Sequence, residues 1–302
     1  MKCFIQKGME IFTITNDYLT VQIQKKGAEI CSIQSKKSGI EYMWNGDASI
    51  WGSTGPVLFP IIGCLKDNHF IYTNKSYSVP KHGFIRNNEN LIVNQLNDRT
   101  VEFSLKYDEK SLVEFPFKFE FILQYKLVEN KIIVKHEVIN HDHVNPIYFS
   151  LGGHPAFKCP FNEKENYDDY YLEFEKNENL SKWDVCENGL IDTNSTPFLI
   201  NQNTINLSHD LFQKDALIFK NPVSNIVNLK SRKSPNYIQV EFTDFPYIGI
   251  WAKPNGDFVC IEPWQGISYS VDTNQLISKK EGIVTLKQKC SYHAKYSIAL
   301  ID

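Results

Sequence analysis

Large apolar side chains alternate with mostly polar ones along Phe117-Lys118-Phe119-Glu120-Phe121-Ile122-Leu123-Gln124-Tyr125-Lys126-Leu127. A period of two predicts a strand with one face in a core and the other toward water. The segment Lys131–Ile139 alternates in the same way, and the short turn at Glu129-Asn130 lies between the two. Two long strands joined by such a turn predict a β-hairpin.

Short runs with the same β pattern recur on both sides of this hairpin. Helical periodicity is nearly absent, and the short candidates lie near Leu207–Gln213 and Asn274–Ser278. Many strands with short turns and no linker predict an all-β fold, a large antiparallel β-sandwich formed by residues 1–302 as one domain. The other predicted strands are Ile11–Ile14, Leu19–Ile23, Ala28–Ile33, Val101–Tyr107, Tyr170–Phe174, Ala216–Phe219, Ile226–Leu229, Tyr237–Phe242, Ile248–Trp251, Phe258–Ile261, Gly282–Leu286 and Tyr292–Leu300.

The composition narrows the class of protein. A formal net charge of −3 over 302 residues gives no basis for binding nucleic acid or an anionic membrane. No run of about 18 apolar residues predicts a membrane span. The seven cysteines are dispersed without a C-x-x-C pair, which indicates reduced thiols rather than a disulfide framework. Because Met1–Glu10 lacks the apolar core of a signal peptide, we expect a soluble cytoplasmic protein, with Met9 as an alternative start.

The segment Ser150-Leu151-Gly152-Gly153-His154-Pro155-Ala156-Phe157 interrupts the β pattern. Two glycines allow a turn or a close approach of the backbone to a ligand, and the proline fixes the chain just after the histidine. The imidazole is therefore presented on a stiff loop or strand end, and its ordinary pKa lies near neutrality. His154 is a candidate acid–base group, and a hydrogen-bonded structural histidine is the alternative.

A glutamate occupies an unusual position in Val259-Cys260-Ile261-Glu262-Pro263-Trp264, because it follows apolar residues on a predicted strand. Glutamate is depleted both in strands and in protein interiors. A partly buried carboxylate beside an indole tends to have a raised pKa, which suits a general base near neutrality. Glu262 is therefore a candidate base, and a salt-bridged structural glutamate is the alternative.

Three further segments offer side chains for binding. In His82-Gly83-Phe84-Ile85-Arg86, the guanidinium provides a planar fork of donors that suits vicinal hydroxyls or a phosphate. Asp215, at the start of an apolar strand, could accept a hydrogen bond from a sugar hydroxyl. Phe59 lies in an apolar segment bracketed by prolines and could stack on a ligand. The structural alternatives are a solvated turn for the polar groups and core packing for Phe59.

Other motifs are weak or missing. The histidine-rich run His136–His143 straddles a strand end and a turn, and we interpret it as a solvated hairpin tip because no complete metal-ligand set is apparent. The sequence contains no nucleophile elbow, P-loop or dinucleotide fingerprint. We therefore expect no metal and no cofactor.

The motifs together resemble those of the aldose 1-epimerase (galactose mutarotase) family, and most closely its LacX-type branch. Each motif is short, but their order and spacing make the resemblance specific, and it spans nearly the whole chain. The motifs are Leu-Phe-Pro-Ile-Ile-Gly at 58–63, His-Gly-Phe-Ile-Arg at 82–86, Gly-Gly-His-Pro-Ala-Phe at 152–157, Asp-Ala-Leu-Ile-Phe at 215–219 and Ile-Glu-Pro-Trp at 261–264.

The resemblance implies a large β-sandwich with a sugar cleft, and an isomerase that interconverts the α and β anomers of a hexose such as galactose or glucose. It implies that His154 is the acid that protonates the ring oxygen and that Glu262 is the base at the C1 hydroxyl. It suggests a monomer or homodimer that needs no cofactor. The expected substrate-binding residues are His82, Arg86, Asp215, Phe59 and Trp264.

One departure from the family pattern and two alternatives remain. Cys64 stands where the LacX-type pattern tends to have an arginine, which could alter binding of an anionic or highly hydroxylated substrate.

One alternative function is a hexose-6-phosphate 1-epimerase. The other is a carbohydrate-binding protein without catalysis, because a fold does not fix a function.

Overall fold

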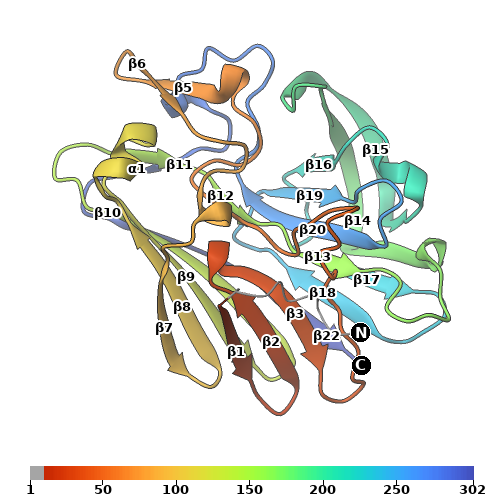
Figure 1. Ribbon diagram of the computed structural model, residues 1–302. Helices are drawn as coiled ribbons and strands as arrows, with labels where there is room; N and C mark the ends of the chain where they lie inside the picture. Colours follow the sequence, from red (N-terminus) through yellow and green to blue (C-terminus); the bar gives the residue numbers. More distant parts are fainter. Residues whose placement is uncertain (1–9) are drawn as a thin grey trace.

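The computed structural model describes residues 10–302, so Met9 and the predicted alternative start lie outside the described residues. Most of the strands form one 15-stranded sheet, and Figure 1 shows β12 and β20 in the middle of the molecule, between β7–β10 and β14–β16. In spatial order the strands are β4 (Val57–Leu58), β12 (Leu151–Gly153), β20 (Phe258–Gln265), β19 (Tyr247–Trp251), β16 (Leu217–Lys220), β14 (Tyr170–Val185), β17 (Ile226–Ser231), β18 (Tyr237–Glu241), β22 (Ser291–Ile301), β10 (Lys131–Asn140), β9 (Phe119–Val128), β8 (Thr100–Lys106) and β7 (Ile92–Asn97), with β13 (Ala156–Lys158) on β20 and β15 (Ile191–Asn206) on β14.

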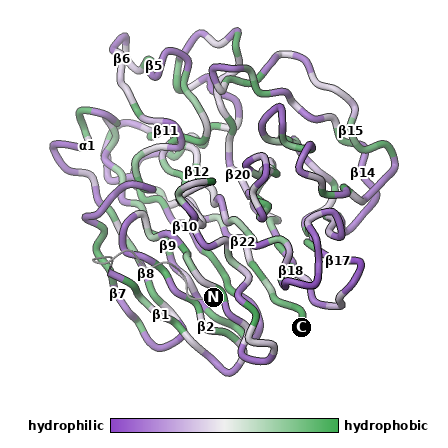
Figure 2. Tube along the Cα trace, turned by 45° about the vertical axis from the view of Figure 1, so that its right-hand side comes forward, coloured by the Kyte–Doolittle hydropathy of each residue, from purple (hydrophilic) through white to green (hydrophobic). Residues whose placement is uncertain are grey.

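The predicted hairpin is confirmed as β9 and β10, which pair antiparallel with Lys131 opposite Val128. Along β9 buried and less buried residues alternate, and Figure 2 shows the matching alternation of hydrophobic and hydrophilic residues in β8 and β9. The side chain of Asn130 in the turn donates a hydrogen bond to the Leu300 carbonyl at 2.7 Å. The hairpin is therefore also tied at its tip to β22, the strand on its other side.

A small sheet covers the buried face of this hairpin region. It consists of β1 (Ile11–Thr15), β2 (Leu19–Gln24) and β3 (Glu29–Ser35), and β1 packs against β8 and β9. The Tyr125 hydroxyl on β9 donates a hydrogen bond to the Ala28 carbonyl at 2.8 Å, which links the two layers. The core therefore lies between two sheets, as the sandwich prediction requires.

Shorter elements complete the fold. Two-stranded sheets pair β5 with β6 and β11 with β21. The predicted helical segments form only 3₁₀ turns, and between residues 10 and 302 no helix has the length and apolar character needed to cross a bilayer. These elements are β5 (His69–Tyr72), β6 (Lys75–Ser78), β11 (Ile147–Phe149), β21 (Val284–Leu286), α1 (Glu109–Glu114) and the 3₁₀ helices η1 (Lys26–Ala28), η2 (Lys66–Asn68), η3 (Ile85–Asn87), η4 (Tyr167–Asp169), η5 (His209–Phe212) and η6 (Ile277–Lys279).

Two sequence interpretations need correction. The predicted strand Tyr170–Phe174 is the start of the much longer β14, which pairs with β15; β15 was missed because its residues are mostly polar and include a proline. His136 is not part of a solvated tip. It lies fully buried on β10 against the rings of Phe121 and Tyr296, whereas His141 at the strand end contacts Glu120 at 2.6 Å.

Candidate active site

A cavity of about 950 Å³ opens beside β20, within the size range of small-molecule sites. Its walls come from the loops after β4 and β19, the loop before β16 and the β14–β15 turn, as well as from β20 itself. Six of the seven predicted site residues line it: His82, Arg86, His154, Asp215, Glu262 and Trp264.

The position of His154 follows from an interruption in strand pairing. β12 and β13 both pair with β20, and the chain leaves the sheet between them at His154-Pro155. The proline has no N–H to continue the ladder. The imidazole therefore stands beside the middle of β20, where its Nε2 lies 3.2 Å from Oε2 of Glu262. The sequence prediction of an acid–base pair thus corresponds to two side chains in direct contact.

The glycines before His154 are required by close packing. A Cβ on Gly152 would lie 2.5 Å from the Pro263 carbonyl oxygen, and one on Gly153 would lie 2.4 Å from the Tyr296 hydroxyl. Any larger residue would push β12 away from β20 or from β22. The Gly-Gly pair therefore brings the histidine close to the strand that carries the glutamate.

Burial controls the protonation of this pair. The side chains of His154 and Glu262 are 10% and 1% exposed. Burial lowers the pKa of His154 to about 3, with a further lowering by the charge of Arg86. Burial raises the pKa of Glu262 well above its usual value, and the nearby charge of Lys81 opposes this rise. Both groups therefore favour their neutral forms.

His82 is held as a hydrogen-bond donor to the cavity. Its Nδ1 accepts a hydrogen bond from the Gly63 N–H at 3.2 Å, so the proton of the neutral ring is on Nε2. Burial lowers the pKa of His82 well below its usual value, and the neighbouring His154 adds to this effect. The two imidazole rings lie 5.8 Å apart, edge to face.

Arg86 is positioned by a tight backbone contact. A Cβ on Gly27 would lie 2.5 Å from the Arg86 carbonyl oxygen, and the Gly27 N–H donates to the Asn88 carbonyl at 2.8 Å. Burial lowers the pKa of Arg86, whereas the nearby carboxylates of Glu29 and Glu262 favour its charged form. The guanidinium is thus a partly desolvated cation beside the acid–base pair, where each of its hydrogen bonds is strong.

Asp215 and Trp264 both line the cavity. Asp215 is exposed on the loop before β16, and its Oδ1 accepts a hydrogen bond from the Ala216 N–H at 2.7 Å. Trp264 is buried on β20 against Gly249, where a Cβ would lie 2.6 Å from the indole ring. Both are placed to contact a ligand, Asp215 as an acceptor and Trp264 as an apolar wall.

The prediction that Phe59 stacks on a ligand is wrong. Its ring is 0% exposed and packs among other aromatic rings, with Phe121 at 4.6 Å and Phe119 at 5.4 Å. Phe59 follows the edge strand β4 and points into the core, so its motif is structural. Cys64 lies at the cavity margin, half-buried against Gly189, and burial raises the pKa of its thiol.

The sequence analysis missed three residues at this site. Trp51 stacks on His154 with ring centroids 5.1 Å apart at 27°, and Trp251 meets the same imidazole edge to face at 5.7 Å. Lys81 lines the cavity and favours ionisation of Glu262. Two of these residues could have been found from the sequence, because Trp251 ends a predicted strand and Lys81 directly precedes His82. Nothing in the sequence around Trp51 indicated its partner.

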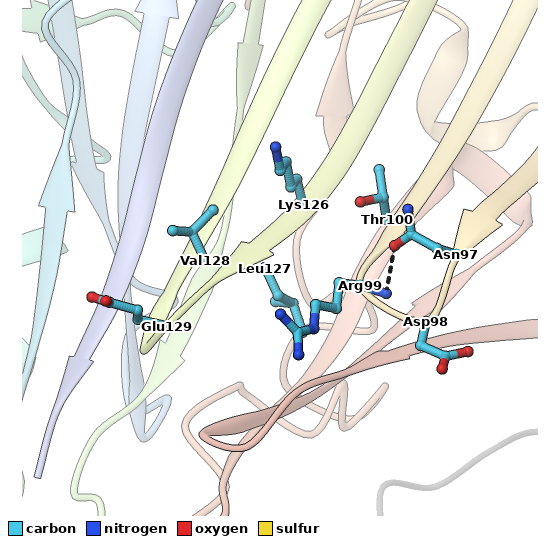
Figure 3. Close-up of a pocket in the computed structure, with 8 residues that line it drawn as sticks. All are labelled: Asn97, Asp98, Arg99, Thr100, Lys126, Leu127, Val128 and Glu129. Carbon is cyan, nitrogen blue, oxygen red and sulfur yellow. Dashed lines mark hydrogen bonds between the residues drawn. The ribbon is translucent and has the colours of Figure 1, made fainter.

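A second hollow of about 590 Å³ lies between the β7–β8 and β9–β10 turns. Figure 3 shows its charged side chains pointing away from one another, and the dashed line marks the 2.9 Å hydrogen bond from the Arg99 N–H to Asn97 Oδ1. None of the predicted site residues lines this hollow. It shows no convergent chemistry, so the cavity beside β20 is the candidate active site.

The chain matches a family model described as aldose 1-epimerase over residues 10–280. It belongs to the aldose 1-epimerase family. It is therefore an isomerase. A curated relative, the plasmid-encoded protein LacX of Lactococcus lactis, is 33% identical over 297 residues, which cover 96% of this chain and 99% of that protein.

Solved structures agree with this membership of the aldose 1-epimerase family. A galactose mutarotase related enzyme from Lactobacillus acidophilus has a TM-score of 0.91 and 33% identity, covering 97% of this chain and 98% of its own. A galactose mutarotase-like protein from Lactobacillus casei has a TM-score of 0.90 and 27% identity, covering 97% and 100%. The predicted family and fold are confirmed.

We expect Trp51→Ala to lower the kcat of this family member by roughly 5- to 30-fold and to change KM little, because an indole over the imidazole stabilises its protonated form by about 1–2 kcal/mol. Trp51→Phe should recover most of the loss. The measurement is steady-state anomerisation, with Trp183→Phe as a control outside the cavity. A change confined to KM would show that Trp51 acts on the sugar and not through His154.

Proposed function

We propose that this protein interconverts the α and β anomers of a pyranose aldose, with His154 as the general acid and Glu262 as the general base. The observation that carries the proposal is their 3.2 Å contact at the floor of a cavity lined by hydrogen-bonding groups. Anomerisation needs one group at O1 and one at the ring oxygen, which are neighbouring atoms of the sugar. Two adjacent proton-transfer groups match that requirement.

The reaction proceeds by ring opening. Glu262 takes the proton from the C1 hydroxyl, the C1=O bond forms, and the bond between C1 and the ring oxygen breaks as His154 protonates that oxygen. Rotation about C1–C2 presents the other face of the aldehyde, and the reverse proton transfers close the ring. Each positioned proton transfer contributes about 10²- to 10⁴-fold to the rate.

The pair can supply the reactive protonation state without exchanging protons with solvent. The neutral form, imidazole with carboxylic acid, holds one proton, and so does the reactive form, imidazolium with carboxylate. Moving that proton across 3.2 Å between His154 and Glu262 converts one form into the other. The charges of Lys81 and Arg86 favour the carboxylate form of Glu262.

The remaining groups would orient the sugar. His82 donates from Nε2, Arg86 donates from its guanidinium, and Asp215 accepts. Such positioning turns the reaction into an effectively unimolecular step, which is a large part of enzymatic rate enhancement. Trp264 and Trp251 provide apolar faces against which a pyranose ring can pack.

We also propose a cytoplasmic location and a monomeric or homodimeric state. The free thiols of Cys64, Cys159, Cys186, Cys260 and Cys290 fit a reducing compartment. The oligomeric state stays a prediction, which light scattering of the purified chain would measure.

Replacing either member of the pair should abolish most turnover. We expect Glu262→Gln and His154→Asn each to lower kcat by at least about 10²-fold, the usual size of a general acid or base contribution. Polarimetry on fresh α-D-glucose and α-D-galactose measures the rate, and calorimetry measures sugar binding. Binding should persist in Glu262→Gln, because the other hydrogen-bonding groups remain.

The matched control is Glu165→Gln. Glu165 is also buried, and it accepts a hydrogen bond from the Tyr170 hydroxyl outside the cavity. It should keep wild-type turnover if it folds. Wild-type turnover in His154→Asn or Glu262→Gln would remove that residue from the mechanism.

The pH profile should lack the usual histidine inflection. The pair gains a second proton only near the lowered His154 pKa of about 3, and it loses its last proton well above the usual glutamate value. In between it holds the one proton that the reaction needs. We expect kcat/KM to stay constant from about pH 5 to about pH 7. A fall centred near 6.5, the usual histidine value, would show that His154 titrates as an exposed group.

A second candidate is an aldose phosphate as substrate, and one observation favours it. Four cationic side chains line the cavity, and within residues 10–302 none of them forms an ion pair or a side-chain hydrogen bond: Lys81, Arg86, Lys214 and Lys253. The acidic side chains of the same lining are Asp184, which pairs with Lys182 at 2.8 Å, and Glu187, Asp215 and Glu262. Unpaired cations around a cavity suit a ligand that carries an anionic group.

The two candidates are separated by comparing glucose with glucose 6-phosphate. If the phosphate is bound, Lys214→Ala with Lys253→Ala should lower kcat/KM for glucose 6-phosphate by about 10-fold or more and leave glucose within about 2-fold, because a charge-assisted hydrogen bond contributes about 1.5–3 kcal/mol. Lys110→Ala on α1 is the surface control. Equal effects on both sugars would exclude a phosphate-specific role for these lysines.

A further inference from the structure

The thiol of Cys260 lies beside the acid–base pair and is a third side chain that could bind a metal ion. The ligating atoms of His154, Cys260 and Glu262 all lie within 4.8 Å of one another, and this is the group of three metal-binding side chains that residues 10–302 bring together. Their exposed fractions are 8%, 0% and 1%. The epimerase mechanism gives Cys260 no role, so its place beside the pair is unexplained by that reaction.

The three side chains are held on rigid elements. Cys260 and Glu262 are two residues apart on β20, so they project from the same face of the strand. Ala156, two residues after His154, pairs with Cys260, which fixes the histidine loop against the same strand. The group is therefore preorganised by the sheet and does not depend on a mobile loop.

Two buried polar atoms of this group lack a hydrogen-bond partner. They are Nδ1 of His154 and Oε2 of Glu262, in side chains that are at least nine-tenths buried. An unpartnered buried polar atom is destabilising. Oε2 lies 3.2 Å from Nε2 of His154 without hydrogen-bond geometry, so a cation placed between these two atoms would coordinate both.

The separation of His154 and Glu262 matches that of two ligands in a tetrahedral zinc shell. Zn–N and Zn–O bonds of about 2.0–2.2 Å put two such ligands roughly 3.4 Å apart, and a Zn–S bond of about 2.3 Å puts the sulfur roughly 3.6 Å from each of them. The observed Nε2–Oε2 distance is 3.2 Å. The thiol, at most 4.8 Å away, needs a shift of only about 1 Å to complete the set.

We propose that His154, Cys260 and Glu262 form an inhibitory site for Zn²⁺ or a cation of similar softness. Imidazole, thiolate and carboxylate are zinc ligands, whereas Mg²⁺ and Ca²⁺ prefer oxygen ligands alone. His154 and Glu262 line the cavity, so the fourth position of the cation faces the space that the sugar would use. The bound cation displaces two protons to solvent, the thiol proton of Cys260 and the one proton held by the His154–Glu262 pair, and it occupies the lone pairs needed for proton transfer. It takes no part in the epimerase reaction.

Zinc titration of the purified full chain tests this site. We expect Zn²⁺ to inhibit anomerisation competitively with the sugar, and a chelator to restore the rate. Cys260→Ser, which leaves His154 and Glu262 in place, should keep its basal activity and require at least about 10-fold more Zn²⁺ for half inhibition, a loss of about 1.4 kcal/mol. Cys159→Ser is the matched control, because Cys159 is also 0% exposed and lies outside the group.

Cobalt provides a readout that needs no activity. Co²⁺ bound to the wild type and to Cys159→Ser should give a near-ultraviolet sulfur-to-cobalt charge-transfer band, and Cys260→Ser should lack it. His154→Asn should keep the band but bind Co²⁺ at least about 10-fold more weakly. Equal zinc inhibition of wild type and Cys260→Ser, or a cobalt band that survives in Cys260→Ser, would overturn the proposal.

The inference rests on the side-chain geometry and not on the proposed epimerase reaction. An inactive protein that still shows the Cys260-dependent cobalt band would support the metal site and contradict the function. If Cys260→Ser loses its cooperative thermal melt, Cys260→Ala takes its place in both measurements. The basal activity and circular dichroism of Cys260→Ala would then test whether that variant is folded.

Discussion

The contact between Nε2 of His154 and Oε2 of Glu262 is the interaction on which the functional architecture depends. Two ionisable groups kept out of water beside each other are expensive to bury unless they neutralise one another or share a proton. The fold accepts this cost in the middle of β20, where the rings of Trp51 and Trp251 lie against His154. A stability-optimised core would hold apolar residues there, and the proposed acid–base role is a reason for keeping the pair.

The sheet supplies the precision that proton transfer needs. β12 and β13 are separate short strands on the same partner, and the gap between them places His154 opposite Glu262. The two glycines before the histidine allow β12 to approach closely enough for this gap to form. Because every part of this arrangement is backbone hydrogen bonding or steric contact, the position of the imidazole is set before any sugar arrives, which reduces the reorganisation needed during reaction.

Sequence reasoning succeeded where chemistry is local and failed where it depends on tertiary partners. The period of two along Phe117–Leu127 predicted the central hairpin, and the unusual positions of His154 and Glu262 singled out two side chains that lie in contact. Phe59 was misassigned because its burial comes from rings on β9, far along the chain, which no local pattern reveals. Trp51 was missed for the same reason, since its function comes from the histidine on which it stacks. The cavity itself arises from the way the strands are ordered in space.

The cavity divides into a floor and a rim with different physical constraints. The floor belongs to β20 and its neighbours, where any change of volume disturbs close-packed strands. The rim consists of loops and turns that carry exposed charges such as Lys214, Asp215 and Lys253. Loop substitutions change charge at little structural cost, whereas floor substitutions destabilise the sheet. In the proposed mechanism the proton transfers take place at the floor, so rim substitutions are the changes that can alter which sugar is accepted while the reaction is retained.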